Sequence, residues 1–117
     1  MDTIVRTSNG RVRGRTIDGV STFLGVSYAA PPVGANRLRP PQPVDSWTGV
    51  RDATRLGPEP PQPQFDRTDP TGMLFDPAVP GDDCLNLNIW TPDPGAAGLP
   101  VMVWSPGGAF RYNSGGS

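Results

Sequence analysis

Histidine is absent from this sequence and cysteine occurs once, and these two shortages restrict its chemistry more than any other feature of its composition. Without histidine, the chain cannot build a Ser-His-acid or Cys-His catalytic site, or a histidine-ligated metal site, from its own residues. The single thiol of Cys84 forms neither an internal disulfide nor a structural zinc site. We therefore expect no metal and no cofactor.

Long apolar runs and an excess of one charge are missing as well. No apolar stretch approaches the length needed to span a membrane, and the first residues, 1–6, lack the basic and apolar regions of a signal peptide. The ten basic residues, all arginine, are balanced by eleven acidic ones, for a net charge of −1. This balance argues against a nucleic-acid or membrane partner. The expected location is the cytoplasm.

Proline and glycine are abundant instead, with 16 and 15 residues among 117, whereas only 35% of the residues are hydrophobic. Because the prolines are clustered and strand-like runs separate them, we predict a β-rich chain with many loops and a thin core. Residues 29–65 are predicted to be irregular, with one helical turn near residues 52–54. Trp47, Val44 and Leu38 favour a loop fixed to a domain surface, and a ligand for an SH3-type domain is the alternative.

Residues 1–28 show the clearest local pattern. Asn9-Gly10 and Asp18-Gly19 separate three strand-like segments, 4–7, 11–17 and 20–28. These dipeptides favour two-residue hairpin turns, since both central positions need positive φ. We therefore predict an antiparallel meander of three strands with turns at these two sites.

Three arginines alternate along the middle of these segments. Arg11, Arg13 and Arg15 occupy every second position, which places them on one face of a strand. A solvated face is the simpler interpretation, and an anion-binding stripe is the alternative.

Two further strand-like segments follow the proline-rich region. In residues 85–90, apolar residues alternate with asparagine, which is typical of a half-buried strand. Residues 99–104 form a continuous apolar run, which predicts a strand buried on both faces. Gly107, Gly108 and Ala109 then offer backbone N–H groups with little side chain in the way, as an oxyanion hole requires. A plain turn is the alternative for these glycines alone.

Six successive motifs resemble the type-B carboxylesterases, a branch of the α/β-hydrolase fold. They are Gly10-Arg11-Val12-Arg13-Gly14; Phe23-Leu24-Gly25-Val26-Ser27-Tyr28-Ala29 followed by Pro31-Pro32-Val33-Gly34; Arg37-Leu38; Trp47; residues 82–92; and residues 101–110. The resemblance implies an α/β fold in which residues 1–117 are the N-terminal part of a single domain. That part comprises an antiparallel β-meander, Pro-rich loops and the first strands of the central sheet.

The resemblance also implies roles at the active site. Gly107, Gly108 and Ala109 would form the oxyanion-hole loop, with N–H donors from Gly108 and Ala109. Phe110 and the loop of Met73, Leu74 and Phe75 would border the substrate pocket. The family's nucleophile elbow, acidic residue and histidine would all lie beyond residue 117.

Other residues receive structural roles from the same resemblance. Arg37 and Asp82 would form an ion pair that fixes the proline-rich loop to the sheet. Cys84 would be a buried, free thiol. Ser105-Pro106 departs from the family's usual Ile-His.

The function implied is hydrolysis of a small-molecule carboxylic ester through an acylated serine. The partner of these residues would be the C-terminal part of the same fold, and the 117 residues alone would be inactive. Two alternatives stay open: a non-catalytic, cholinesterase-like adhesion protein and a free-standing Pro-rich interaction module.

Overall fold

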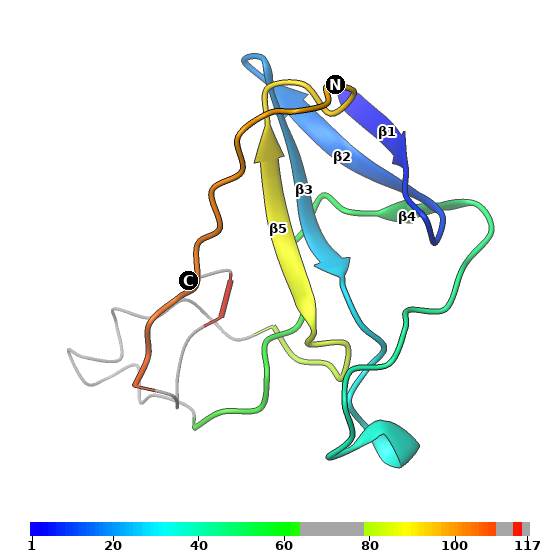
Figure 1. The fold of residues 1–117 in the computed structure, drawn as a ribbon, viewed down its shortest axis with the longest axis vertical. Helices are drawn as coiled ribbons and strands as arrows, with labels where there is room; N and C mark the ends of the chain where they lie inside the picture. The colour runs from blue at the N-terminus through cyan, green and yellow to red at the C-terminus, as the bar shows by residue number, and fades with distance from the viewer. Residues whose placement is uncertain (64–78, 110–113, 116–117) are drawn as a thin grey trace.

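A computed structural model describes residues 1–63, 79–109 and 114–115 of the chain. One sheet contains five strands: β1 (Asp2–Arg6), β2 (Arg11–Ile17), β3 (Val20–Ser27), β4 (Val50–Asp52) and β5 (Asn86–Thr91) (Figure 1). A 3₁₀ turn, η1 (Gly34–Asn36), lies between β3 and β4 in the sequence. The order β1-β2-β3-β5 is antiparallel throughout, whereas β4 lies parallel to β2. No helix in these ranges is long and apolar enough to cross a membrane.

The predicted meander is confirmed, with one correction at its first turn. Asp18 and Gly19 have φ values of 49° and 77° and form the predicted two-residue turn between β2 and β3. The β1–β2 turn is instead centred one residue earlier, on Ser8 and Asn9, because the Thr7 N–H and the Thr7 hydroxyl both donate to the Gly10 carbonyl, each at 2.8 Å. Gly10 therefore closes this turn, in the same register as the Arg6–Arg11 pair, and does not lie at its centre.

The helical turn predicted near residues 52–54 is wrong, because Val50–Asp52 forms β4. The strand pairs with the start of β2, and the Ala53 N–H continues the ladder by donating to the Arg13 carbonyl at 2.7 Å. The other end of β2 pairs with β3. The edge of β2 is thus divided between two strands, and the helical turn of the proline-rich region is η1.

Trp47 fixes the proline-rich segment to the sheet, as predicted. Its indole N–H donates to the Arg11 carbonyl at 2.9 Å, and its backbone N–H donates to the Asn9 carbonyl at 2.9 Å. The guanidinium of Arg51 lies 4.0 Å from the centre of the indole ring. Leu38 takes no part, since it is 96% exposed.

The core is thin, in line with the composition. Val12, Phe23 and Ala53 are buried together, and Val5, Val26 and Trp47 pack against them. Gly14 leaves space for this cluster, because a Cβ there would lie 2.6 Å from the Phe23 ring and 2.3 Å from the Thr22 carbonyl oxygen.

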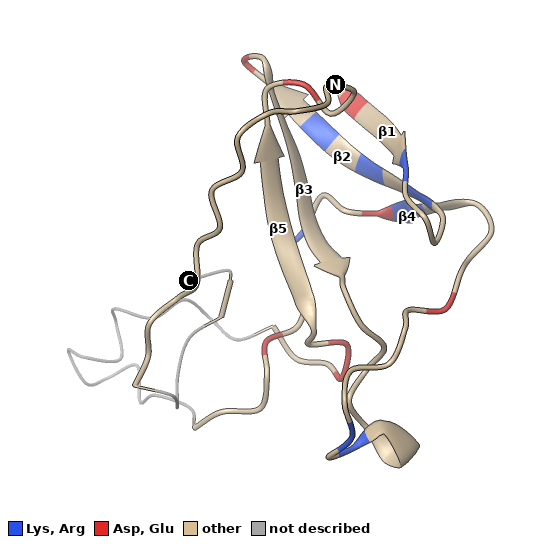
Figure 2. Cartoon of the chain, viewed as in Figure 1, with Lys and Arg blue, Asp and Glu red and all other residues tan. Residues whose placement is uncertain are grey.

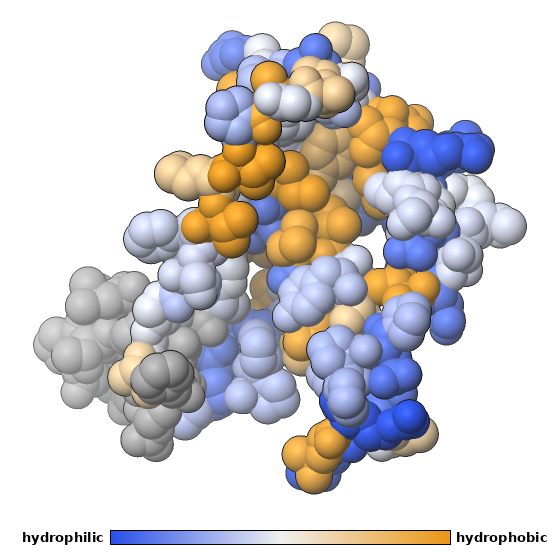
Figure 3. All heavy atoms as spheres, in the orientation of Figure 1, coloured by the Kyte–Doolittle hydropathy of each residue, from blue (hydrophilic) through white to orange (hydrophobic). Residues whose placement is uncertain are grey.

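The segment at residues 99–104 forms no strand, contrary to the prediction. Val101, Met102, Val103 and Trp104 are between 80% and 93% exposed. Apolar atoms gather on this face around β5 and the segment that follows it (Figure 3). A central strand requires a neighbour at each edge, and nothing within residues 1–63 or 79–109 pairs with this segment.

Candidate functional site

The candidate oxyanion loop is a turn directly after the exposed apolar segment. Gly108 and Ala109 have φ values of 141° and 55°, so a non-glycine residue at 109 adopts a left-handed conformation. Among the residues that the structure describes, none apart from the two chain neighbours of Gly107 has an atom within 4 Å of the position of a Cβ at Gly107. The turn therefore presents main chain with only hydrogen or methyl side chains, as the composition of these three residues indicates.

The residues predicted to border the substrate pocket lie outside the described ranges. Met73, Leu74 and Phe75 belong to 64–78, and Phe110 belongs to 110–113. Their role stays a prediction from the sequence.

The predicted ion pair of Arg37 and Asp82 is not formed. Among the residues described, the ion pair within 4.0 Å joins Arg13 and Asp52. Asp82 is exposed, and its carbonyl accepts the Cys84 N–H at 2.9 Å in a tight turn. The next carboxylate is the one that turns inward, because the Ser27 hydroxyl donates to Asp83 at 2.8 Å.

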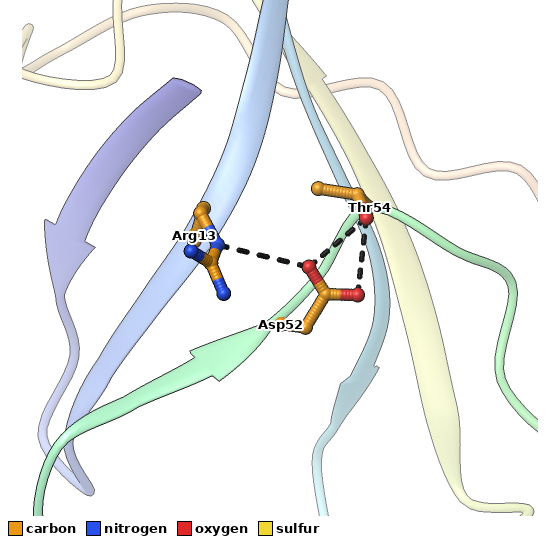
Figure 4. Close-up of polar contacts among 3 residues, drawn as sticks. All are labelled: Arg13, Asp52 and Thr54. Atoms are coloured by element: carbon orange, nitrogen blue, oxygen red, sulfur yellow. Dashed lines mark hydrogen bonds and ion pairs between the residues drawn. The ribbon is translucent and has the colours of Figure 1, made fainter.

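Basic residues gather along β2, and the other charged residues are spread over β1, β4 and the loops (Figure 2). The Arg13 Nε lies 3.8 Å from the Asp52 Oδ1, and the Thr54 hydroxyl lies 2.9 and 3.0 Å from the two oxygens of that carboxylate (Figure 4). The side chains of Arg13 and Asp52 are 42% and 48% exposed. This cluster is a solvated surface feature, which agrees with the simpler interpretation of the arginine face.

Cys84 is buried and free, as predicted. Within the parts of the chain that the structure describes, no group of three or more His, Cys, Asp or Glu side chains is placed to hold a metal ion.

The sequence predicts the strand at residues 85–90 correctly but not which face of it is engaged. Leu87 and Ile89 are each 40% exposed, whereas the side chains of Asn86 and Asn88 make hydrogen bonds. The Asn86 amide donates to the carbonyls of Pro58 and Asp83 at 2.9 and 3.0 Å. The alternation of asparagine with apolar residues predicts the strand. It does not indicate that the asparagine side chains are the ones that bond to the rest of the fold.

Asn88 connects the sheet to the chain that follows the candidate loop. Its Oδ1 accepts the backbone N–H of Gly25 at 2.9 Å, and its Nδ2 donates to the carbonyl of Gly115 at 2.9 Å. One side chain therefore joins β3, β5 and the segment beyond Ala109.

Comparison with known proteins defines the class of this fold. A carboxylesterase of Geobacillus stearothermophilus superposes with a TM-score of 0.79 and 42% identity, covering 98% of this chain and 22% of that one. A PNB esterase superposes with a TM-score of 0.80 and 40% identity, covering 97% and 22%. The sheet is thus part of an α/β-hydrolase fold.

The profile of the carboxylesterase family matches residues 1–117. Phenmedipham hydrolase of Pseudarthrobacter oxydans is 44% identical over 113 residues, which are 96% of this chain and 23% of the relative. Para-nitrobenzyl esterase of Bacillus subtilis is 41% identical over 114 residues, covering 96% and 22%. The chain belongs to the carboxylesterase family and spans about a fifth of the length of these relatives.

Proposed function

We propose that this chain is the part of a carboxylic-ester hydrolase that carries two backbone donors of the oxyanion hole, the N–H groups of Gly108 and Ala109. The observation that carries the proposal is the match of the carboxylesterase family to residues 1–117. The left-handed turn at Ala109 lies within the matched residues. Membership of a family of esterases supports the reaction. The turn of small residues supports the role of this loop.

In the proposed reaction, a serine supplied by the rest of the fold attacks the ester carbonyl. The carbonyl oxygen becomes negatively charged in the tetrahedral intermediate, and preorganised N–H donors about 3 Å away stabilise that charge. A water molecule then hydrolyses the acyl-enzyme. The chain provides charge stabilisation, and the nucleophile, the histidine and the acid come from elsewhere in the fold.

The names of the relatives indicate the class of substrate. They are a phenmedipham hydrolase, a para-nitrobenzyl esterase and a fumonisin B1 esterase. We infer a small-molecule ester as the substrate of the complete enzyme.

A chimera tests the proposal, in which residues 1–117 replace the matched segment of the Bacillus subtilis para-nitrobenzyl esterase. We expect the chimera to hydrolyse para-nitrobenzyl esters. Replacing Ala109 by lactic acid converts its backbone N–H into an ester oxygen, and kcat should then fall by roughly 10²- to 10³-fold, the loss typical of one oxyanion donor.

The matched control is the same replacement at Ala97, an exposed alanine of the loop after β5. This variant should keep its kcat. A folded but inactive chimera would contradict the proposed reaction, and equal rates for the two lactic acid variants would contradict the role of Ala109.

A further inference from the structure

We propose that Asn88 is a positioning residue for the oxyanion loop. Its side-chain amide fixes the chain that leaves the loop, at Gly115, to a bulge in β3 around Gly25. The inference rests on the proposed function of Gly107–Ala109. It adds that the geometry of this loop depends on Asn88, a residue of β5.

The bulge in β3 creates the first half of this connection. Phe23 pairs with Ile89 and Val26 pairs with Leu87, so two residues of β3 lie opposite the single residue Asn88 of β5. A bulge of this kind removes backbone groups from the regular ladder and redirects them. The N–H of Leu24 accordingly donates to the Ala53 carbonyl at 2.8 Å, outside the β3–β5 ladder.

The remaining N–H of the bulge belongs to Gly25 and is bound by the Oδ1 of Asn88 at 2.9 Å. Gly25 has a φ of 65°, and a Cβ at this position would lie 2.8 Å from the backbone nitrogen of Gly57. Only glycine fits there, so the position of its N–H is closely defined. This N–H fixes the orientation of the Asn88 amide.

The other end of the amide holds the chain beyond the loop. Because Oδ1 accepts the Gly25 N–H, Nδ2 points away from β3 and donates to the Gly115 carbonyl at 2.9 Å. A carboxylate cannot donate to that carbonyl, and an apolar side chain of the same shape can serve neither end. Asparagine is therefore required by both contacts together.

Asn86 provides a matched comparison on the same strand. It lies two residues away on the same face of β5, and its amide also donates to backbone carbonyls. Those carbonyls belong to Pro58 and Asp83, which lie before β5 and outside the oxyanion loop. Loss of this donor should weaken the fold without moving the loop.

The test compares Asn88→Asp with Asn86→Asp in the chimera with the para-nitrobenzyl esterase. Active sites are counted by stoichiometric labelling of the nucleophile, so that unfolded protein does not enter the rates. The readouts are kcat and KM for a para-nitrobenzyl ester and Ki for a trifluoromethyl ketone, which forms a charged hemiketal in the oxyanion hole.

We expect Asn88→Asp to lower kcat and to raise Ki by about tenfold or more each, with little change in KM, because misplaced donors act on the oxyanion and not on substrate binding. Asn86→Asp should keep both values within about twofold of the parent, as expected for support that acts only on the fold. Asn88→Ala, which introduces no charge, should behave like Asn88→Asp.

Equal kinetics for the Asn86 and Asn88 variants in an active chimera would overturn the inference while leaving the proposed function intact. A folded chimera without activity before any substitution would instead refute the proposed function, and the role of Asn88 would fall with it.

Discussion

The exposed segment at residues 99–104 should become a buried strand when residues 1–117 are joined to the rest of an α/β-hydrolase fold. Val101, Met102, Val103 and Trp104 are each at least 80% exposed here. Burying a large apolar side chain stabilises a protein by roughly 2 kcal/mol, or about 8 kcal/mol for the four. This equals a large part of the 5–15 kcal/mol that is typical of a whole domain.

The assay is hydrogen exchange of the backbone amides of residues 101–104, measured for the chain alone and for the chimera. In the chain alone these amides should exchange within seconds, because no strand of the described ranges protects them. In the chimera the exchange should slow by about a thousandfold or more, since protection approaches the stability of the fold. The amides of Ala97 and Gly98, in the exposed turn after β5, are an internal control and should exchange rapidly in both.

The same experiment includes an activity measurement and a check of solution state. The chain alone should hydrolyse no ester above the blank rate, because an oxyanion hole without a nucleophile has no charge to stabilise. It should also tend to associate through the edge of β5 that does not face β3. Slow exchange across residues 101–104 in a monomer, or ester turnover by the chain alone, would refute the reasoning.

Three further predictions concern the fold. Gly14→Ala should destabilise the chimera by about 2–3 kcal/mol in urea unfolding, because the new Cβ would lie 2.3 Å from a carbonyl oxygen of β3. The control Gly95→Ala, whose Cβ would make only an ordinary contact, should be nearly neutral. Cys84 should react with a thiol reagent at least tenfold more slowly in the folded chimera than in urea, and equal rates would contradict its burial. Asp52→Asn should change stability by less than about 1 kcal/mol at low salt, since its 3.8 Å pair with Arg13 is half exposed; a larger loss would show that this surface cluster supports β4.

Local patterns predicted the parts of the fold that depend on local interactions. The meander follows from alternation and from Asp18-Gly19, whose positive φ angles form the turn directly. The shifted turn at Ser8-Asn9 depends on the Thr7 hydroxyl and on Trp47, which lies far away in the sequence. A dipeptide signal contains no information about such a distant partner.

Strand β4 and the asparagine face were missed because they depend on tertiary context. Three residues in a proline-rich region carry no periodic signal, and β4 exists because β2 offers an unpaired edge beside Arg11–Arg13. Asn88 of β5 is engaged because a bulge in β3 leaves an N–H that needs an acceptor, and Asn86 because the carbonyls of Pro58 and Asp83 lie beside it. Bulges that redirect single groups are set by the neighbouring strand and cannot be read from the strand itself.

The backbone turn of the candidate loop could be predicted from the sequence, whereas the predicted ion pair is not formed. Gly107–Ala109 follow an apolar run and form a turn of small residues, as their composition indicates. The predicted ion pair of Arg37 and Asp82 requires two side chains to meet across a loop, and it is not formed. The carboxylate that bonds to the sheet is that of Asp83, which accepts the Ser27 hydroxyl. The distance between two flexible side chains is not fixed by sequence motifs.

The division of the β2 edge has a consequence for the order in which the sheet assembles. The β1–β2 and β2–β3 hairpins join neighbouring segments, whereas β4 and β5 reach β2 and β3 from distant parts of the chain. Because short loops close at a smaller entropic cost than long ones, the meander is expected to form first during synthesis and to serve as the template for the later strands. Pulse-labelled amides of β2 should then become protected before those of β5, and the reverse order would show that the sheet nucleates from its distant contacts.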